Sequence, residues 1–392
     1  MRILYIAHLT EIGGASIALR NIIKELSSDN DIAVLLPQRK GWLVDELIIL
    51  QCQLYFSNFE NMVYPTSVFL KYGWYHPIGY AKFIKGLANK LFKKWHAQRD
   101  LKRIILDFNP DIVHSNSSVI GIAPEVCKKM CIPHVWHLRE YLPMGSQMYI
   151  IPSLRKFKNK LYKSGNYNIA ITKGVYKYYD ISKSNSTVIY DGVFDEPTSS
   201  KMVEYEQENY ILVVGRIEAA KGIKLILDAF VKISKNYPQL RILFAGGFAN
   251  EQYFEECRDF ITSKELKDKI VFLGERKDVY TLMRTAKFLV VASPREGFGF
   301  TTAEAMLNGC LVIGCDTTGT KEQFDNGIEI TGQEIGLRFK TREELISQME
   351  YALTHDTLEM RKRAYDVVVS KYTIQEHGKQ LISFYNKILK NP

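Results

Sequence analysis

The sequence of 392 residues lacks the features that define several common classes of protein. No apolar run reaches the length of about 20 residues that a membrane-spanning helix requires. The six cysteines show neither the spacing of a zinc site nor that of a disulfide framework, and Cys127 and Cys131 are most simply two small core residues on one helix face. This cysteine usage predicts a reducing, cytoplasmic compartment.

The dinucleotide-binding fingerprint Gly-x-Gly-x-x-Gly is also absent from the loop after the first apolar segment, which counts against a dehydrogenase. That loop instead contains Gly13 and Gly14 side by side, followed by a helical stretch to about Leu26. A plain strand-to-helix turn explains two adjacent glycines as readily as a ligand site does.

Apolar segments with the character of strands alternate with helical stretches throughout the sequence. This alternation predicts parallel, doubly wound sheets of the α/β class. Two series of similar length indicate two Rossmann-like domains facing a cleft, which we expect over residues 1–190 and 209–372, with a linker at 191–208. The expected strands lie near residues 2–7, 32–36, 53–56, 111–115, 133–136 and 168–172 in the first domain, and near 210–214, 240–245, 269–273, 287–292, 311–314 and 335–339 in the second.

The most informative motif lies at residues 294–306, where two carboxylates flank a glycine turn. Glu296 and Glu304 are eight positions apart, and Gly297-Phe298-Gly299 lies between them after an apolar strand at 287–292. A strand, a glycine turn and a helix together direct free backbone N–H groups and a positive helix end toward an anion. Carboxylates beside such an anion site are suited to bind sugar and ribose hydroxyls.

A second motif follows the apolar strand at 210–214. Gly215-Arg216 comes directly after the strand, and Lys221-Gly222 follows a few residues later. An arginine presents a planar fork to phosphate oxygens, and a lysine presents a compact point charge. Fixed cations stabilise a departing diphosphate more than the intact donor, because negative charge grows on it in the transition state.

Together the two motifs resemble those of retaining glycosyltransferases with the GT-B fold, most closely family four, the glycosyl transferases group 1. The resemblance implies that Glu296 binds hydroxyls of the donor sugar and that Glu304 binds the ribose. It also implies that Arg216 and Lys221 bind the donor diphosphate. Further contacts with this diphosphate are expected at Gly14, Phe298 and Gly299. A final helix at residues 373–392 is expected, by analogy with this fold, to pack back on the first domain.

The resemblance also implies a catalytic role for His137, near the reacting carbon of the donor sugar. This histidine follows an apolar segment at a strand end. The chain continues with Leu138-Arg139-Glu140, whereas many family members have an aspartate directly after the histidine. The linker departs as well, with Asp191-Gly192 where the family usually has Asn-Gly. A histidine satisfied within the core is the alternative interpretation, and it is the one we prefer for His114 and His134.

No metal ion or other cofactor is expected. Many other glycosyltransferases hold a divalent ion with an Asp-x-Asp pair, and this chain contains Asp29-Asn30-Asp31. That pair precedes a strand instead of following one, which is typical of a turn. With Arg216 and Lys221 in the place of a metal, we predict that activity survives a chelator.

The net charge of +9 is concentrated in residues 1–170. The segment from Tyr80 to Phe108 places apolar residues at helical spacing with lysines between them, after the aromatic residues Tyr72, Trp74 and Tyr75. A basic helix with aromatic residues is typical of an element that binds an anionic membrane surface. The alternative is that its apolar stripe packs on the sheet. The expected membrane or acceptor face comprises Lys82, Lys85, Lys90, Lys93, Lys94 and Trp95.

These observations predict a retaining hexosyltransferase that uses a nucleotide-sugar, with a UDP-sugar favoured, and a glycan or lipid-linked acceptor in bacterial surface polysaccharide synthesis. We expect it in the cytoplasm, where it can lie peripherally on the inner face of the plasma membrane. A sugar-nucleotide epimerase of the same fold and a non-catalytic GT-B partner subunit are the alternatives. Nucleic acid is not expected as a partner, because it would explain the basic charge but not the carboxylates beside the phosphate site.

Overall fold

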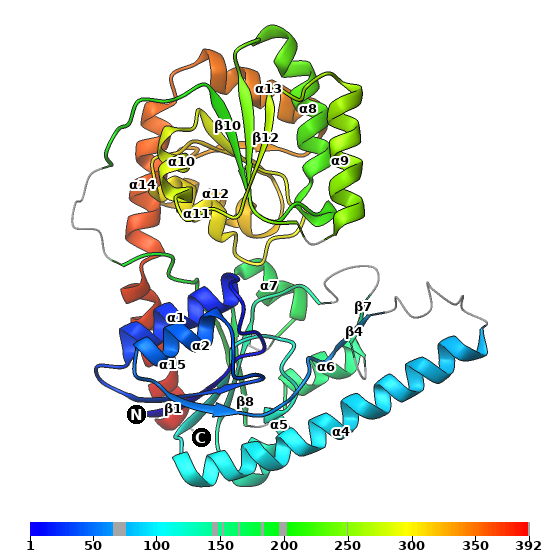
Figure 1. Ribbon diagram of the computed structural model, residues 1–392. Helices are drawn as coiled ribbons and strands as arrows, with labels where there is room; N and C mark the ends of the chain where they lie inside the picture. Colours follow the sequence, from blue (N-terminus) through cyan, green and yellow to red (C-terminus); the bar gives the residue numbers. More distant parts are fainter. Residues whose placement is uncertain are drawn as a thin grey trace. The chain divides into compact units, whose positions relative to one another are not determined.

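The computed structural model describes residues 1–390 except 66–75, 143–147, 151–152, 164, 182–183, 196–201 and 249. The chain divides into two compact units (Figure 1). Unit 1 comprises Met1–Gly192 together with Ile374–Pro392, and unit 2 comprises Val193–Thr373. Tyr72, Trp74 and Tyr75 lie outside the described residues.

Unit 1 is built on a parallel sheet of seven strands in the order β3-β2-β1-β5-β6-β8-β9. This non-sequential order is that of a doubly wound sheet, as the alternation of strands and helices predicts. A separate antiparallel pair joins β4 (Val63–Pro65) to β7 (Met148–Ile150). The seven strands are β1 (Arg2–Ile6), β2 (Asp31–Leu36), β3 (Gln53–Phe56), β5 (Ile112–Ser115), β6 (His134–Leu138), β8 (Asn166–Ala170) and β9 (Ser186–Val188).

Helices of unit 1 pack against the sheet through two apolar clusters. One cluster joins β1 and β2 to the last helix of the chain, whose Leu381 and Tyr385 are buried in it. The other joins the same strands to the long helix α4 (Pro77–Phe108) through Leu101 and Ile105. The helices are α1 (Gly14–Leu26), α2 (Trp42–Ile49), α4 (Pro77–Phe108), α5 (Ala123–Met130), α6 (Leu154–Leu161), α7 (Lys173–Tyr179) and α15 (Ile374–Lys390).

Unit 2 contains a parallel sheet of six strands in the order β12-β11-β10-β13-β14-β15. Its strands are β10 (Tyr210–Val214), β11 (Arg241–Ala245), β12 (Ile270–Gly274), β13 (Phe288–Val291), β14 (Val312–Cys315) and β15 (Leu337–Phe339). Its helices are η1 (Ala219–Lys221), α8 (Ile223–Asn236), α9 (Glu251–Ser263), α10 (Val279–Thr285), α11 (Phe300–Leu307), α12 (Thr318–Thr331), α13 (Arg342–Thr354) and α14 (Leu358–Lys371).

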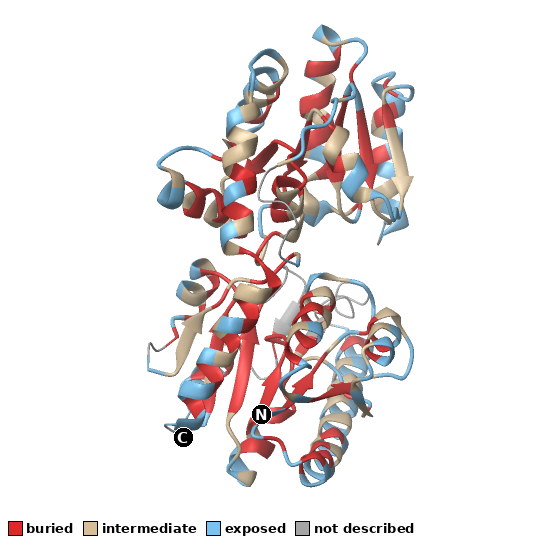
Figure 2. Cartoon of the chain, turned by 90° about the vertical axis from the view of Figure 1, so that its left-hand side faces the viewer, coloured by how far each residue is buried: buried red, intermediate tan, exposed pale blue. Residues whose placement is uncertain are grey.

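The central strands of the two sheets are buried along most of their length (Figure 2). Strands covered on both faces read as continuous apolar runs, which explains why the sequence located them well. One core expectation was wrong in part. Cys127 is buried, but Cys131 is exposed, because it ends α5 in the left-handed conformation with φ 56°. None of the described helices is both long enough and apolar enough to span a membrane.

Candidate functional site

A pocket in unit 2 lies where β10 and β13 end. It contains about 340 Å³ of empty space, part of it open to solvent. Parallel strands that end side by side bring the residues after them to one edge of the sheet, where ligands of such folds bind. The structure thereby brings four predicted residues to this pocket, namely Arg216, Lys221, Glu296 and Gly299.

Glycines allow the turn after β10 to approach β13 closely. A Cβ atom on Gly222 would lie 2.4 Å from the carbonyl oxygen of Ala292, and its φ of +69° also favours glycine. This contact places η1 against the end of β13. Lys221, the last residue of η1, therefore lies beside Glu296 in the pocket lining.

The charges of the pocket are only partly neutralised within the protein. Lys221 Nζ donates to Glu296 Oε1 at 2.7 Å, so the lysine orients the carboxylate predicted to hold the sugar. Arg216 is 68 % exposed, and its guanidinium lies 3.6 Å from the carboxylate of Glu218. A cation this exposed remains accessible to an incoming diphosphate.

The start of α11 adds a positive helix end to the same pocket. Gly299 precedes the helix with φ +91°, and Thr301 and Thr302 also line the pocket. The first N–H groups of a helix have no partner within it, and they favour an anion. The side chain of Phe298 is buried against Tyr372, so any contact that Phe298 makes with the donor must come from its backbone.

Glu304 lies one turn into α11 and does not line the pocket itself. The Tyr280 hydroxyl donates to Glu304 Oε1 at 3.2 Å, and burial raises the pKa of Glu304 above its ordinary value. Sequence reasoning did not identify Tyr280, because no motif marks a single tyrosine on a short helix. This contact engages one of the two carboxylate oxygens of Glu304.

The turn between β14 and α12 contacts the loop that contains Glu296. Sequence reasoning did not identify this turn as part of the site. The Glu296 N–H donates to Thr318 Oγ1 at 2.9 Å, and the Gly319 N–H donates to the Glu296 carbonyl at 3.0 Å. Gln323 Nε2 donates to the carbonyls of Phe298 and Gly299 at 2.7 and 3.0 Å. The run Thr317-Thr318-Gly319-Thr320 after a predicted strand was the available signal.

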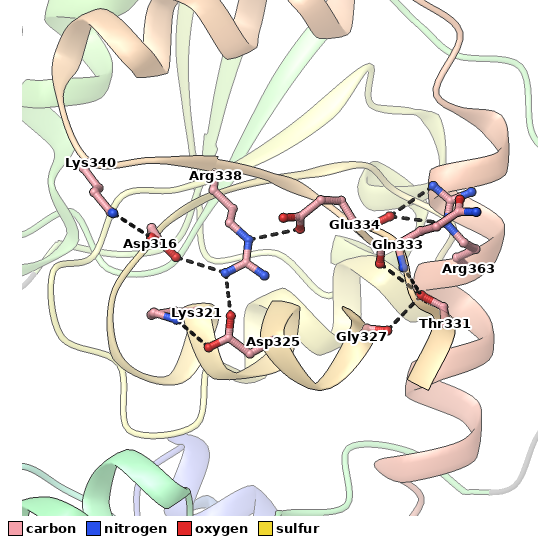
Figure 3. Close-up of polar contacts among 10 residues, drawn as sticks. All are labelled: Asp316, Lys321, Asp325, Gly327, Thr331, Gln333, Glu334, Arg338, Lys340 and Arg363. Atoms are coloured by element: carbon pink, nitrogen blue, oxygen red, sulfur yellow. Dashed lines mark hydrogen bonds and ion pairs between the residues drawn. The ribbon is translucent and has the colours of Figure 1, made fainter. Parts of the chain in front are cut away.

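A network of charged side chains anchors this turn to β15 (Figure 3). Arg338 Nη1 lies 3.1 Å from Asp316 Oδ1 and 2.7 Å from Asp325 Oδ1, and Lys340 Nζ lies 3.3 Å from Asp316 Oδ2. Asp316 directly precedes the turn, and Asp325 lies within α12. The network therefore fixes the turn from both sides.

In unit 1 the structure places His137 in the interior. The residue is 1 % exposed, its Nε2 has no hydrogen-bond partner among the described residues, and its ring lies 5.4 Å from that of His114. Burial, followed by the charge of Arg139, holds the pKa of His137 well below its ordinary value. The ring is thus neutral and enclosed within unit 1, and its catalytic role stays a prediction.

The two segments that depart from the family pattern, after His137 and at the linker, contact each other through Arg139 and Asp191. Arg139 Nη1 lies 2.5 Å from Asp191 Oδ2, with only 4 % and 0 % of the two side chains exposed. Arg139 also donates to Asn116, whose side chain donates to the carbonyl of Ala15 at 2.8 Å. This network reaches the first turn of α1, where Gly14 lies.

The basic helix α4 is covered along one half only. Its C-terminal half is buried through Ala97, Leu101 and Ile105, as the alternative interpretation expects. The N-terminal half extends away from the sheet (Figure 1), and Phe92 and Trp95 are 60 % and 52 % exposed. Of the predicted lysines, Lys93 contacts Glu60 at 2.5 Å, Lys94 contacts Glu125 at 3.4 Å, and Lys90 donates to two backbone carbonyls.

Comparisons with known proteins find a matching family model and structures of the same fold. Residues 195–366 match the family model described as glycosyl transferases group 1. The crystal structure of HepE from Anabaena in complex with UDP covers 99 % of this chain and 100 % of its own, with a TM-score of 0.74 and 18 % sequence identity. At this identity the likeness shows the fold, which is GT-B.

Two curated relatives are similar in sequence. The trehalose synthase of Pyrococcus horikoshii is 26 % identical over 217 residues, which are 49 % of this chain and 51 % of that protein. This match therefore spans about half of the length of the relative. An uncharacterized glycosyltransferase of Methanocaldococcus jannaschii is 24 % identical over 330 residues, 81 % of this chain and 79 % of its own.

These findings confirm the resemblance that the sequence motifs indicate. Residues 195–366 of unit 2 match the glycosyl transferases group 1 model, and the described chain has the GT-B fold with two Rossmann-like α/β domains.

Proposed function

We propose that this protein is a retaining glycosyltransferase that moves a sugar from a nucleotide-diphosphate sugar to a lipid-linked glycan acceptor in bacterial surface polysaccharide synthesis. One observation carries the proposal. Arg216, Lys221, Glu296 and the start of α11 line one pocket at the end of two parallel strands. Two cations and a helix start suit a departing diphosphate, and the carboxylate suits a sugar.

In this proposal each residue has a defined role. Arg216, Lys221 and the first N–H groups of α11 bind the diphosphate, Glu304 binds the ribose and Glu296 binds the sugar. Because Glu296 is engaged by Lys221 at 2.7 Å, we assign it to sugar binding and not to a covalent intermediate. Retention then requires that the acceptor attacks from the face on which the diphosphate leaves, with the leaving phosphate accepting the proton.

A UDP-sugar is the donor that we favour, since HepE, which shares the fold, was crystallised with UDP and with UDP-glucose. A thermal-shift screen of UDP-, GDP- and ADP-sugars tests the donor class, because a ligand that binds only the folded state raises the melting temperature. The product anomer, read by NMR, tests retention. Conversion of the donor without any acceptor would indicate an epimerase instead.

We also propose that no metal ion takes part, because Arg216 and Lys221 occupy the place where a metal would neutralise the diphosphate. Asp29 lies in the turn between α1 and β2 of unit 1 and Asp31 begins β2, so both are distant in sequence from the pocket residues of unit 2. Turnover should persist in EDTA. Collapse in EDTA with recovery on adding Mn²⁺ would contradict this part of the proposal.

The acceptor side rests on α4. Several apolar residues of this helix are between 46 % and 62 % exposed and alternate with basic residues, and their spacing places them on one face of the helix; they are Tyr80, Ile84, Leu91, Phe92 and Trp95. An exposed apolar face with basic flanks matches an anionic bilayer, which also holds lipid-linked acceptors. We propose that unit 1 binds such a surface through this half of α4.

Vesicle flotation tests the membrane proposal. We expect the protein to float with phosphatidylcholine vesicles that contain phosphatidylglycerol, and the double variant Phe92→Ser with Trp95→Ser to remain in solution. Ile330→Ser in unit 2 is the matched control, since Ile330 is 49 % exposed on another helix. Equal flotation of wild type and double variant, or binding to neither kind of vesicle, would refute the membrane proposal.

A further inference from the structure

Six non-glycine residues of the described chain have a positive φ, and one of them differs from the rest. Five lie at helix C-termini, where a left-handed residue ends the helix. Thr318 instead begins α12, with φ 46°. A β-branched residue in this region is a genuine outlier, and such strain is retained only where the surroundings enforce it. The five residues at helix ends are Gln51, Asn109, Cys131, Asp180 and Glu265.

The strained conformation directs two consecutive residues at Glu296. The Glu296 N–H donates to Thr318 Oγ1 at 2.9 Å, and the Gly319 N–H donates to the Glu296 carbonyl at 3.0 Å. Both backbone polar groups of Glu296 are thereby fixed by the turn. Its side chain is fixed separately by Lys221 at 2.7 Å.

The turn also packs directly on the residues after Glu296. A Cβ atom on Gly319 would lie 2.4 Å from the Phe298 carbonyl oxygen and 2.8 Å from that of Gly297. The two backbones therefore touch without a side chain between them. Asp316, immediately before the turn, forms ion pairs with Arg338 and Lys340 at β15 (Figure 3). These ion pairs limit the freedom of the turn to change its conformation.

We propose that Thr318 is a positioning residue, whose strained backbone is retained because it places Glu296 to receive the donor sugar. The proposal rests on the proposed function. An extended or helical φ at residue 318 would rotate its hydroxyl away from the Glu296 N–H. The diphosphate ligands Arg216 and Lys221 come from another turn, whereas Thr318 forms its hydrogen bond with Glu296, so we expect its main effect on the sugar.

The test compares Thr318→Gly with Thr317→Gly. Thr317 is extended, with φ −140°, so glycine relieves no strain there. Glycine at 318 removes the clash of the Cβ atom but also the hydroxyl. We therefore expect Thr318→Gly to lower the melting temperature less than Thr317→Gly does. In the transfer assay we expect the opposite order, with about a tenfold or larger loss of kcat/KM for Thr318→Gly.

Ligand affinities separate positioning from a general structural role. Thr318→Gly should bind UDP, which has no sugar, as tightly as wild type, but the UDP-sugar more weakly. Thr318→Ser, which keeps the hydroxyl, should restore turnover to near that of wild type. Equal losses of UDP and UDP-sugar affinity, or wild-type turnover of Thr318→Gly, would overturn the inference alone. A wild-type protein that binds neither UDP nor any UDP-sugar would overturn both the inference and the assignment of the donor.

Discussion

Arg139 in unit 1 and Arg216 in unit 2 each lie just beyond the end of a parallel strand, but their environments differ. The Arg139 side chain is 4 % exposed and lies 2.5 Å from Asp191, whereas the Arg216 side chain is 68 % exposed. In unit 1 the charges neutralise each other within the protein. In unit 2 they remain accessible to a ligand. A cation at a strand end thus marks a binding site only where the fold leaves it accessible.

The largest expected effect that separates the two units is their response to acid. Burial lowers the pKa of His134 and of His377 to about 4, and lowers those of His114 and His137 as well. The unfolded chain takes up these protons near pH 6.5, so stability is lost as the pH falls from about 6.5 toward 4. The loss is roughly 3 kcal/mol for each of His134 and His377 over that interval.

Unit 2 contains a single histidine, the exposed His355, and therefore lacks this contribution. Hydrogen exchange at pH 7 and pH 5, corrected for the intrinsic rate, measures the two units separately. We expect protection to fall in β5, β6 and α15 before it falls in β10 and β13. An equal loss in both units would contradict the role of the buried histidines.

The next effect concerns the buried ion pair. Asp191→Ala leaves the charge of Arg139 buried without its partner, which should lower the free energy of unfolding by about 3–5 kcal/mol. Denaturant titration measures this change. Glu255→Ala is the matched control, because its pair with Arg258 is half-exposed and should contribute less than about 1 kcal/mol. Similar effects of the two substitutions would show that burial of the Arg139–Asp191 pair does not increase its contribution to the free energy of unfolding.

Removing a pocket cation should impair turnover without a comparable loss of stability. We expect Arg216→Ala and Lys221→Ala to lower kcat by about 10²–10³, because each removes a charge from the developing diphosphate. Steady-state kinetics with the donor found by thermal shift measures the effect. The controls Arg258→Ala and Lys267→Ala change exposed residues outside the pocket lining and should turn over normally. Near-normal rates for both pocket variants would show that the diphosphate does not bind at Arg216 and Lys221.

The smallest effect is expected at Tyr280. Tyr280→Phe removes one hydrogen bond to Glu304, and such a bond contributes about 0.5–1.5 kcal/mol. The KM for the donor should rise by up to about tenfold while kcat changes little, since the ribose does not react. Substituting Tyr351, a similarly exposed tyrosine on α13, with phenylalanine should leave both constants unchanged. A fall in kcat alone for Tyr280→Phe would exclude a role in ribose binding.

The sequence predicted those features that depend on local pattern and on sheet geometry. Continuous apolar runs located the strands, and the rule that parallel strands end at one edge brought Arg216, Lys221 and Glu296 together. Features that depend on distant partners were not accessible. Asp191 lies 52 positions from Arg139, and nothing local pairs them.

The spacing of apolar residues in the sequence could not predict three further features of the structure. Both halves of α4 have apolar residues at helical spacing, and only tertiary packing decides that the half with Leu101 is covered while that with Trp95 is exposed. Likewise, a histidine near a strand end can face either side of the sheet, and His137 faces the interior. The strained φ of Thr318 results from its contacts with the Glu296 loop, which no local propensity encodes.

The most direct test of the donor site is hydrogen exchange of the wild-type protein with and without UDP. If the diphosphate lies between Arg216, Lys221 and the start of α11, UDP should protect residues 215–222 and 296–304 in unit 2. Binding of UDP without protection of either segment would contradict the site.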